Sequence, residues 1–332
     1  MINKKTILAA SVSALAILAG CATKQPPKAS AHAPEYTGPV ITLHPAPGPT
    51  TLSPSPSLPT AIEFVNARRQ EVGLPAVAVD DNIAVAAADH ARYLQINRAS
   101  GHDEAVGLPG FTGVDVTSRV RLHTTSEGAS ETFVEYGGQH TPELPIEDIF
   151  NAPMHRGIVF FPWKRAGEAS NTGDSAITVV DFSDLAPGLK ETELIAYPYD
   201  GQDDAPTLWV DLERPDPLGP GYAGQTVGFP LTLSGGANAH IELSAFDLRD
   251  KHGKKVKCHI AALTPADAAR NTAVCTPLEP LRAGMRYTAH ATGHLTQTYV
   301  FDRAPFDLTW SFQTASGTSH PARLIAQNAV AR

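Results

Sequence analysis

Apolar residues recur at helical spacing in the stretch that begins at Thr60. Thr60 and Glu63 make a capping box, and Gly73-Leu74-Pro75 is a stop signal, so we expect a helix over about residues 61–72. A second set of small and apolar residues falls on one helical face: Ile83, Ala87, Ala91 and Leu94. This set predicts a closely packed second helix that ends near Asn97.

Beyond residue 194 the period of the apolar positions changes to two, which is typical of strands with one buried face. The alternating residues are Val256, Cys258 and Ile260, then Tyr287, Ala289 and Ala291, then Phe306, Leu308, Trp310 and Phe312. Turn signals such as Gly235-Gly236 separate the runs. Residues 194–314 are therefore expected to form a β-sandwich that resembles an immunoglobulin-like module, followed by a polar tail over 315–332.

Between residues 21 and 59 a proline occurs every few positions, with few apolar side chains among them. A proline-rich chain favours the extended polyproline II conformation at about 3.1 Å per residue, so this segment could reach on the order of 100 Å. We expect it to be a tether.

The first 20 residues have the pattern of a secretion signal. Lys4 and Lys5 precede an apolar run over residues 6–18 that is too short to span a bilayer comfortably. The end of the run, Leu18-Ala19-Gly20-Cys21, resembles the lipobox of bacterial lipoproteins, which implies that Cys21 is acylated and becomes the mature first residue. Ala22 stands where an aspartate would retain such a protein, so the resemblance favours the outer membrane facing the periplasm, or the cell surface. An ordinary signal peptide that happens to contain a cysteine is the alternative.

Charge and cysteine content narrow the classes of partner. The net charge is −8 and the isoelectric point is near 5.9, without a basic patch, so we exclude nucleic acid as a partner. With Cys21 lipidated, two cysteines remain, and in an oxidising envelope Cys258 and Cys275 could form a disulfide. Two separate buried thiols are the other interpretation.

The stretch FVNARRQEVGLPAVAVDDNIAVAAADHARYLQINRASGH resembles the opening of the CAP superfamily (cysteine-rich secretory, antigen 5 and pathogenesis-related 1 proteins), in its bacterial SCP-like branch. The resemblance implies an α–β–α sandwich over residues 60–184, around a cleft lined by histidines and glutamates. With the β-sandwich behind it, the expected fold class is α+β.

The same resemblance predicts three residues that line the cleft. His102 matches the family's first histidine after the second helix, and Glu127 in Ser-Glu-Gly stands where the family has a Gly-Glu-Asn motif. His155 in Asn-Ala-Pro-Met-His-Arg matches the second histidine. The family's second glutamate is replaced near Ala152.

Two imidazoles and a carboxylate could bind a divalent ion such as zinc or calcium weakly, or could equally hold a buried water. The chain has no Gly-x-Ser-x-Gly elbow, His-Glu-x-x-His pair, P-loop or dinucleotide-binding motif. Ser126, His155 and Glu127 could form a catalytic trio, but such a set arises easily by chance. The expected function is therefore an envelope-anchored lipoprotein that binds a lipid or other envelope ligand in the cleft without catalysis. The alternatives are a metal-dependent hydrolase acting on cell-wall or protein substrates, and a structural adhesion protein.

Overall fold

The computed structural model describes residues 36–48, 60–137, 145–261 and 271–317. The predicted signal sequence, Cys21 and the residues after 317 lie outside these ranges. The chain divides into two compact units, Met1–Thr37 and Gly38–Arg332. No helix among the described residues has the length and apolar content needed to cross a bilayer.

The described residues form five helices, of which the first two end close to the predicted positions. They are α1 (Ala61–Glu71), α2 (Asp81–Asn97), α3 (Val116–His123), α4 (Pro145–Asn151) and α5 (Pro153–Val159). The Thr60 hydroxyl accepts a hydrogen bond from the Glu63 amide at 3.1 Å, and Asp80 caps α2 in the same way. Both helices therefore begin with a side-chain cap.

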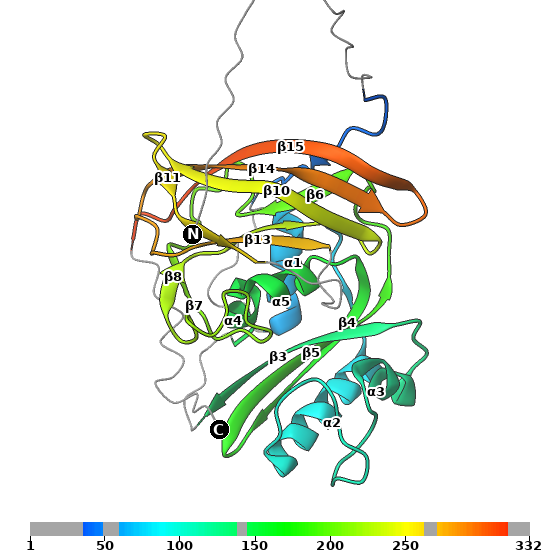
Figure 1. The fold of residues 1–332 in the computed structure, drawn as a ribbon. Coiled ribbons are helices and arrows are strands. Elements are labelled where there is room, and N and C mark those ends of the chain that lie inside the picture. Colours follow the sequence, from blue (N-terminus) through cyan, green and yellow to red (C-terminus); the bar gives the residue numbers. More distant parts are fainter. Residues whose placement is uncertain (1–35, 49–59, 138–144, 262–270, 318–332) are drawn as a thin grey trace, which may run out of the picture. The chain divides into compact units, whose positions relative to one another are not determined.

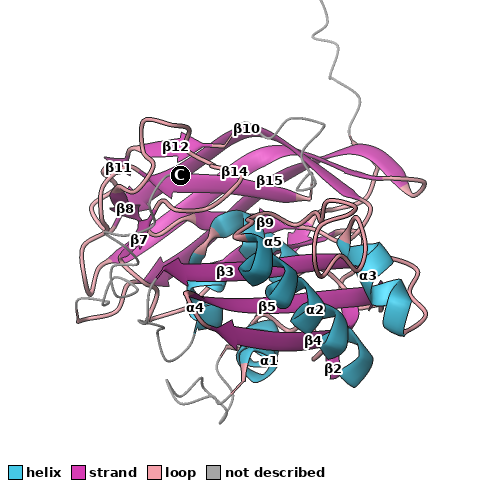
Figure 2. Cartoon of the chain, turned by 90° about the horizontal axis from the view of Figure 1, so that it is seen from below, coloured by secondary structure: helices cyan, strands magenta, loops and turns pink. Residues whose placement is uncertain are grey.

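Four strands form the sheet of the first half, in the order β2-β4-β5-β3 (Figure 2). Their bounds are β2 (Ala78–Val79), β3 (Ala129–Gly137), β4 (Trp163–Thr172) and β5 (Ser175–Leu185). Helices α2 and α3 cover one face, and α1, α4 and α5 lie on the other (Figure 1). Successive residues of β5 point to opposite faces, so that Val179 packs under α2 and Val180 joins the core with α1. The predicted α–β–α sandwich is present.

The second half contains two further sheets and a hairpin. The first sheet has the order β1-β6-β9-β13-β12: β1 (Thr42–Leu43), β6 (Glu193–Tyr197), β9 (Leu231–Ser234), β13 (Thr272–Pro277) and β12 (Cys258–Ile260). The second has the order β11-β10-β14-β15: β11 (Lys255–Val256), β10 (Ala239–Asp250), β14 (Arg286–Gln297) and β15 (Phe301–Gln313). The hairpin is β7 (Leu208–Val210) with β8 (Thr226–Gly228).

These two sheets enclose one hydrophobic core, to which both contribute alternate residues. Leu231 and Leu233 come from the first sheet, and the predicted row from Phe306 to Phe312 comes from the second. A disulfide joins Cys258 on β12 to Cys275 on β13, with 5.6 Å between the Cα atoms. The fold class is thus α+β, while the likeness of this part to immunoglobulin domains stays a prediction.

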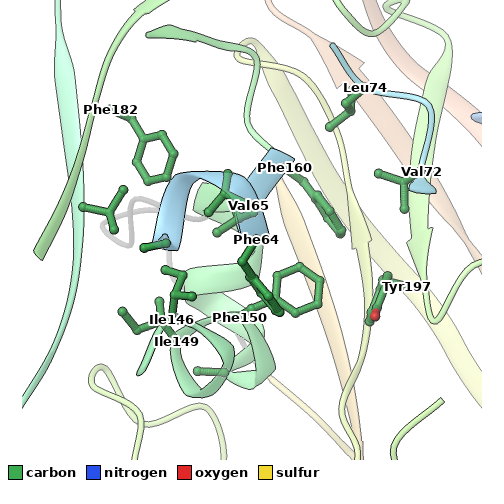
Figure 3. Close-up of a cluster of buried hydrophobic side chains, with 14 of the residues drawn as sticks. Phe64, Val65, Val72, Leu74, Ile146, Ile149, Phe150, Phe160, Phe182 and Tyr197 are labelled. Carbon is green, nitrogen blue, oxygen red and sulfur yellow. The ribbon is translucent and has the colours of Figure 1, made fainter. Parts of the chain in front are cut away.

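The two halves share a continuous core. Phe150 and Phe160 of the helical half lie 5.0 and 5.7 Å, ring to ring, from Tyr197 on β6 (Figure 3). The buried guanidinium of Arg156 lies over the Tyr197 ring and donates to the Pro230 carbonyl at 2.8 Å. Aromatic rings from both halves pack against each other, and the buried Arg156 guanidinium contacts both halves. This packing fixes the position of one half relative to the other.

Part of the predicted tether also belongs to this packing. Thr42 and Leu43 pair in parallel with β6, and Ile41 beside them is buried. The physical reason is the local composition, because Ile41-Thr42-Leu43 is a short β-forming run between prolines and can add a strand to a sheet edge.

Candidate functional site

His102 follows α2 and is held by a buried carboxylate on β3. Its Nδ1 lies 2.8 Å from Oε1 of Glu131, whose side chain is 1% exposed, whereas the His102 side chain is 44% exposed. The His102 ring also packs edge-on against Phe133, two residues further along β3, at 5.0 Å between centroids. The imidazole is therefore fixed on one side and open to solvent on the other.

A network of buried charges lies beneath His102. Arg119 donates to Oε2 of Glu131 at 2.7 Å and to the His102 carbonyl at 2.9 Å. His90 lies between Glu104, at 3.0 Å from Nδ1, and the Gly101 carbonyl, at 3.2 Å from Nε2. The segment that carries His102 is thus tied to α2 and α3 through fully buried side chains.

Two facing carboxyl groups in this network have opposite pKa shifts. Burial alone would raise the pKa of Glu131, but the hydrogen bond from His102 and the charge of Arg119 outweigh it and hold the pKa below its usual value. Asp181 faces Glu131 in the β3–β5 register. Burial, together with the charge of Glu131, raises the pKa of Asp181 well above its usual value. Glu131 is accordingly the ionised partner of His102, whereas the surroundings of Asp181 favour its protonated form.

His155 lies in the first turn of α5 and is held by a second carboxylate. Its Nδ1 is 2.7 Å from Oε1 of Glu213, and the same oxygen accepts the backbone amides of Met154 and His155, each at 2.9 Å. The Glu213 side chain is completely buried, and that of His155 is 12% exposed. Ala152, the N-cap of α5, provides no side-chain hydrogen bond, so Glu213 satisfies the helix start.

The two imidazoles come from elements on opposite faces of the sheet and meet beside its edge strand, β3. Their ring centroids are 6.4 Å apart and the rings are tilted by 39°. A carboxylate only accepts hydrogen bonds, so each Nδ1 must donate, and each neutral imidazole keeps the lone pair of Nε2 for another partner. The pair can therefore accept two donors from one bound group.

Glu127 is not part of this pair, contrary to the sequence-based prediction. It is exposed in the loop before β3, and its amide donates to Asp184 at 2.8 Å. Along an extended chain it lies roughly 13 Å from Glu131, which holds His102 instead. The catalytic trio with Ser126 is not assembled either, because the Ser126 hydroxyl pairs with Ser183 and His155 pairs with Glu213.

A tight metal site does not fit these residues. Zinc sites use at least three protein ligands, and here both carboxylates are occupied in holding the imidazoles. Two imidazoles on one tetrahedral zinc ion have centroids about 5 Å apart, which is closer than the 6.4 Å found. Within the ranges that the structure describes, no group of three His, Cys, Asp or Glu side chains is arranged to hold a metal ion. Weak metal binding stays a prediction.

Two surface depressions lie away from the histidine pair. One, of about 480 Å³, is lined by residues 121–126. The other, of about 290 Å³, lies beside residues 185–191 and 236–238. Neither depression is lined by His102 or His155. The assignment of the site therefore depends on the geometry of the two histidines alone.

Sequence reasoning missed Glu131, Glu213 and His90. Glu131 could have been found as a carboxylate on the strand face that packs under α2, because such a charge needs a partner. His90 lies on α2 and is fully buried. Glu213 lies 58 residues after His155, in the other half of the chain, so no motif around His155 could predict it.

Comparison with known proteins matches one part of the chain to a family. Residues 62–157 match the family model described as CAP, the cysteine-rich secretory protein family, which identifies this stretch as a CAP domain. An outer surface protein from Borrelia burgdorferi is 18% identical, with a TM-score of 0.32, over 38% of this chain and 90% of that one. An extracellular SCP-domain protein from Bacillus anthracis str. Ames is 19% identical, with a TM-score of 0.31, over 37% of this chain and 38% of that one. No curated protein matches the chain.

Proposed function

We propose that this CAP-domain protein is an envelope-anchored lipoprotein that binds a lipid or other envelope ligand between His102 and His155, without catalysing a reaction. The observation that carries the proposal is the pair of imidazoles, each fixed through Nδ1 by its own buried carboxylate. Side chains fixed in this way have little rotamer freedom to lose, which lowers the cost of binding.

The chemistry of the pair suits a ligand that carries hydroxyl or amine groups on an apolar body. The two Nε2 atoms accept hydrogen bonds, and the half-buried ring of Phe133 provides an apolar wall beside His102. Attachment to a membrane through Cys21, as the lipobox resemblance implies, would keep the site near such ligands.

The test is native mass spectrometry of the full chain, solubilised from its own envelope in detergent, followed by extraction of the compounds that it carries. We expect the wild type to carry a mass that His102→Ala/His155→Ala loses. His44→Ala is the matched control, because His44 pairs with Glu193 at 2.8 Å outside the site. Equal loads in all three proteins would refute the proposal.

The same protein preparation distinguishes the hydrolase alternative from the binding proposal. Isolated envelope is incubated with each protein, and soluble fragments are measured with and without a chelator. We expect no release above the double variant. Release that requires both His155 and a metal would replace the binding proposal with the enzymatic one.

A further inference from the structure

The carboxylate that fixes His155 comes from the C-terminal half of the chain. Glu213 lies between β7 and β8, well beyond the stretch that matches the CAP family. The resemblance to the CAP family implies that a second glutamate of the family is replaced near Ala152, which stands at the N-cap of α5. Glu213 therefore supplies from elsewhere in the chain the acidic group that the local sequence lacks.

The contacts of Glu213 do two things at once. Its Oε1 accepts the Met154 and His155 amides, which would otherwise be unsatisfied at the start of α5. The same oxygen accepts a hydrogen bond from His155 Nδ1 at 2.7 Å, which fixes both the ring orientation and the tautomer that leaves Nε2 unprotonated.

The loop that carries Glu213 is itself held firmly. The Asp211 amide donates to Gln225 at 3.0 Å and the Gly224 amide donates to the Asp211 carbonyl at 2.6 Å, so the two ends of the loop are closed. Oδ1 of Asp216 accepts the amides of Leu218 and Gly219 at 2.8 and 2.7 Å. A rigid support of this kind is what a positioning residue needs.

We propose that Glu213 is a positioning residue for His155, so that the C-terminal half is a component of the ligand site and not a spacer. The ligand part of this inference rests on the proposed function, but the positioning part does not. In physical terms, docking of the two halves orders the second imidazole, and a CAP half without its partner would present His155 in an undefined tautomer and orientation.

The experiment uses the full chain with ¹⁵N-labelled histidine and compares wild type, Glu213→Gln and Glu213→Ala. Glu193→Gln is the matched control, because it alters a carboxylate–histidine pair of similar length outside the site. In the wild type at alkaline pH we expect the ¹⁵N shifts of His155 to show a protonated Nδ1 and an unprotonated Nε2. Observation of the opposite tautomer in the wild type would overturn the inference without any variant.

In Glu213→Ala we expect the tautomer of His155 to become mixed, and the Met154 and His155 amides to exchange with solvent about ten to a hundred times faster. Glu213→Gln should restore amide protection and the tautomer, since its carbonyl oxygen still accepts. Glu193→Gln should leave all signals of His155 unchanged. An unchanged tautomer in Glu213→Ala would overturn the inference.

The carried ligand is then measured for the same proteins by native mass spectrometry. We expect a loss in Glu213→Ala and recovery in Glu213→Gln. If the tautomer becomes mixed and the load stays at the wild-type level, Glu213 still positions His155, and the ligand part of the inference is overturned together with the role of His155 in the proposed function.

Discussion

Asp211, near the loop that carries Glu213, is a buried acid whose replacement should stabilise the protein. The residue is fully buried, and within the described part of the chain no donor reaches either carboxyl oxygen. Burial, together with the neighbouring charge of Asp216, raises its pKa to about 7. Glu213 acts in the same direction, and the charge of Arg214 opposes the shift. The native protein therefore resists ionisation of this group.

The magnitude follows from the shift. In the unfolded chain the group titrates near 3.8, so folding raises its pKa by about three units, each worth 1.36 kcal/mol. Because the folded pKa is the higher one, the native state is unaffected below about pH 4, loses stability as pH rises from about 4 to 7, and carries the full cost of about 4 kcal/mol above that. The cost at pH 5 is about 1.5 kcal/mol by the same relation.

Asn cannot ionise, so Asp211→Asn should remove this cost while it keeps the shape of the protonated acid. Urea unfolding at pH 5 and pH 8 measures the gain, which should be larger at pH 8 by about 2 to 3 kcal/mol. Asp203→Asn, which removes an exposed carboxylate, is the control and should change stability little at either pH. A gain that does not depend on pH, or a loss at both values, would refute the reasoning.

Four further outcomes are expected. Cys21→Ser should move the protein from the membrane to the soluble fraction, and identical fractionation of wild type and variant would exclude the lipid anchor. Reduction of the Cys258–Cys275 disulfide should lower the free energy of unfolding by about 3 kcal/mol, as calculated for a loop of this length; free thiols in non-reduced envelope protein would contradict it. Calorimetry should show zinc binding in about the micromolar range or weaker, reduced by His102→Ala and by lower pH, since only neutral imidazole ligates; nanomolar binding would show a missed ligand. Arg156→Lys should cost about 3 kcal/mol in urea unfolding, because lysine cannot reach the carbonyl groups that the guanidinium satisfies, and an unchanged midpoint would contradict it.

Features that depend on neighbours in sequence were predictable. The cap at Thr60 is a contact between residues three apart in sequence. The alternation of apolar and polar residues from Phe306 to Phe312 indicates a strand with one buried face. His102 and His155 were predicted from short segments that resemble family motifs, and their rings lie 6.4 Å apart in the structure. In each case the signal and its cause lie within a few residues of each other, so periodicity or a motif is enough.

The carboxylates that hold the two histidines were not predictable in this way. They are identified by being buried beside a histidine, and burial depends on the tertiary structure. Glu127 had the motif position, yet a side chain in the loop before β3 is solvated and has no need of a partner. Glu131, on the face of β3 that packs under α2, is desolvated, and the cost of its charge is offset only by Arg119 and His102. That pairing requires the sheet register and α3 to be known first.

Glu213 shows the same limit over a longer distance. Its function depends on the packing of α5 against the C-terminal half, which Arg156 and the aromatic rings around Tyr197 determine. The family resemblance places a glutamate near Ala152, close to His155 in sequence. In this chain Glu213 takes that role, and only the tertiary structure brings it close to His155. The loss of a motif residue therefore does not imply the loss of its chemistry, because a carboxylate needs to reach His155 in space and not in sequence.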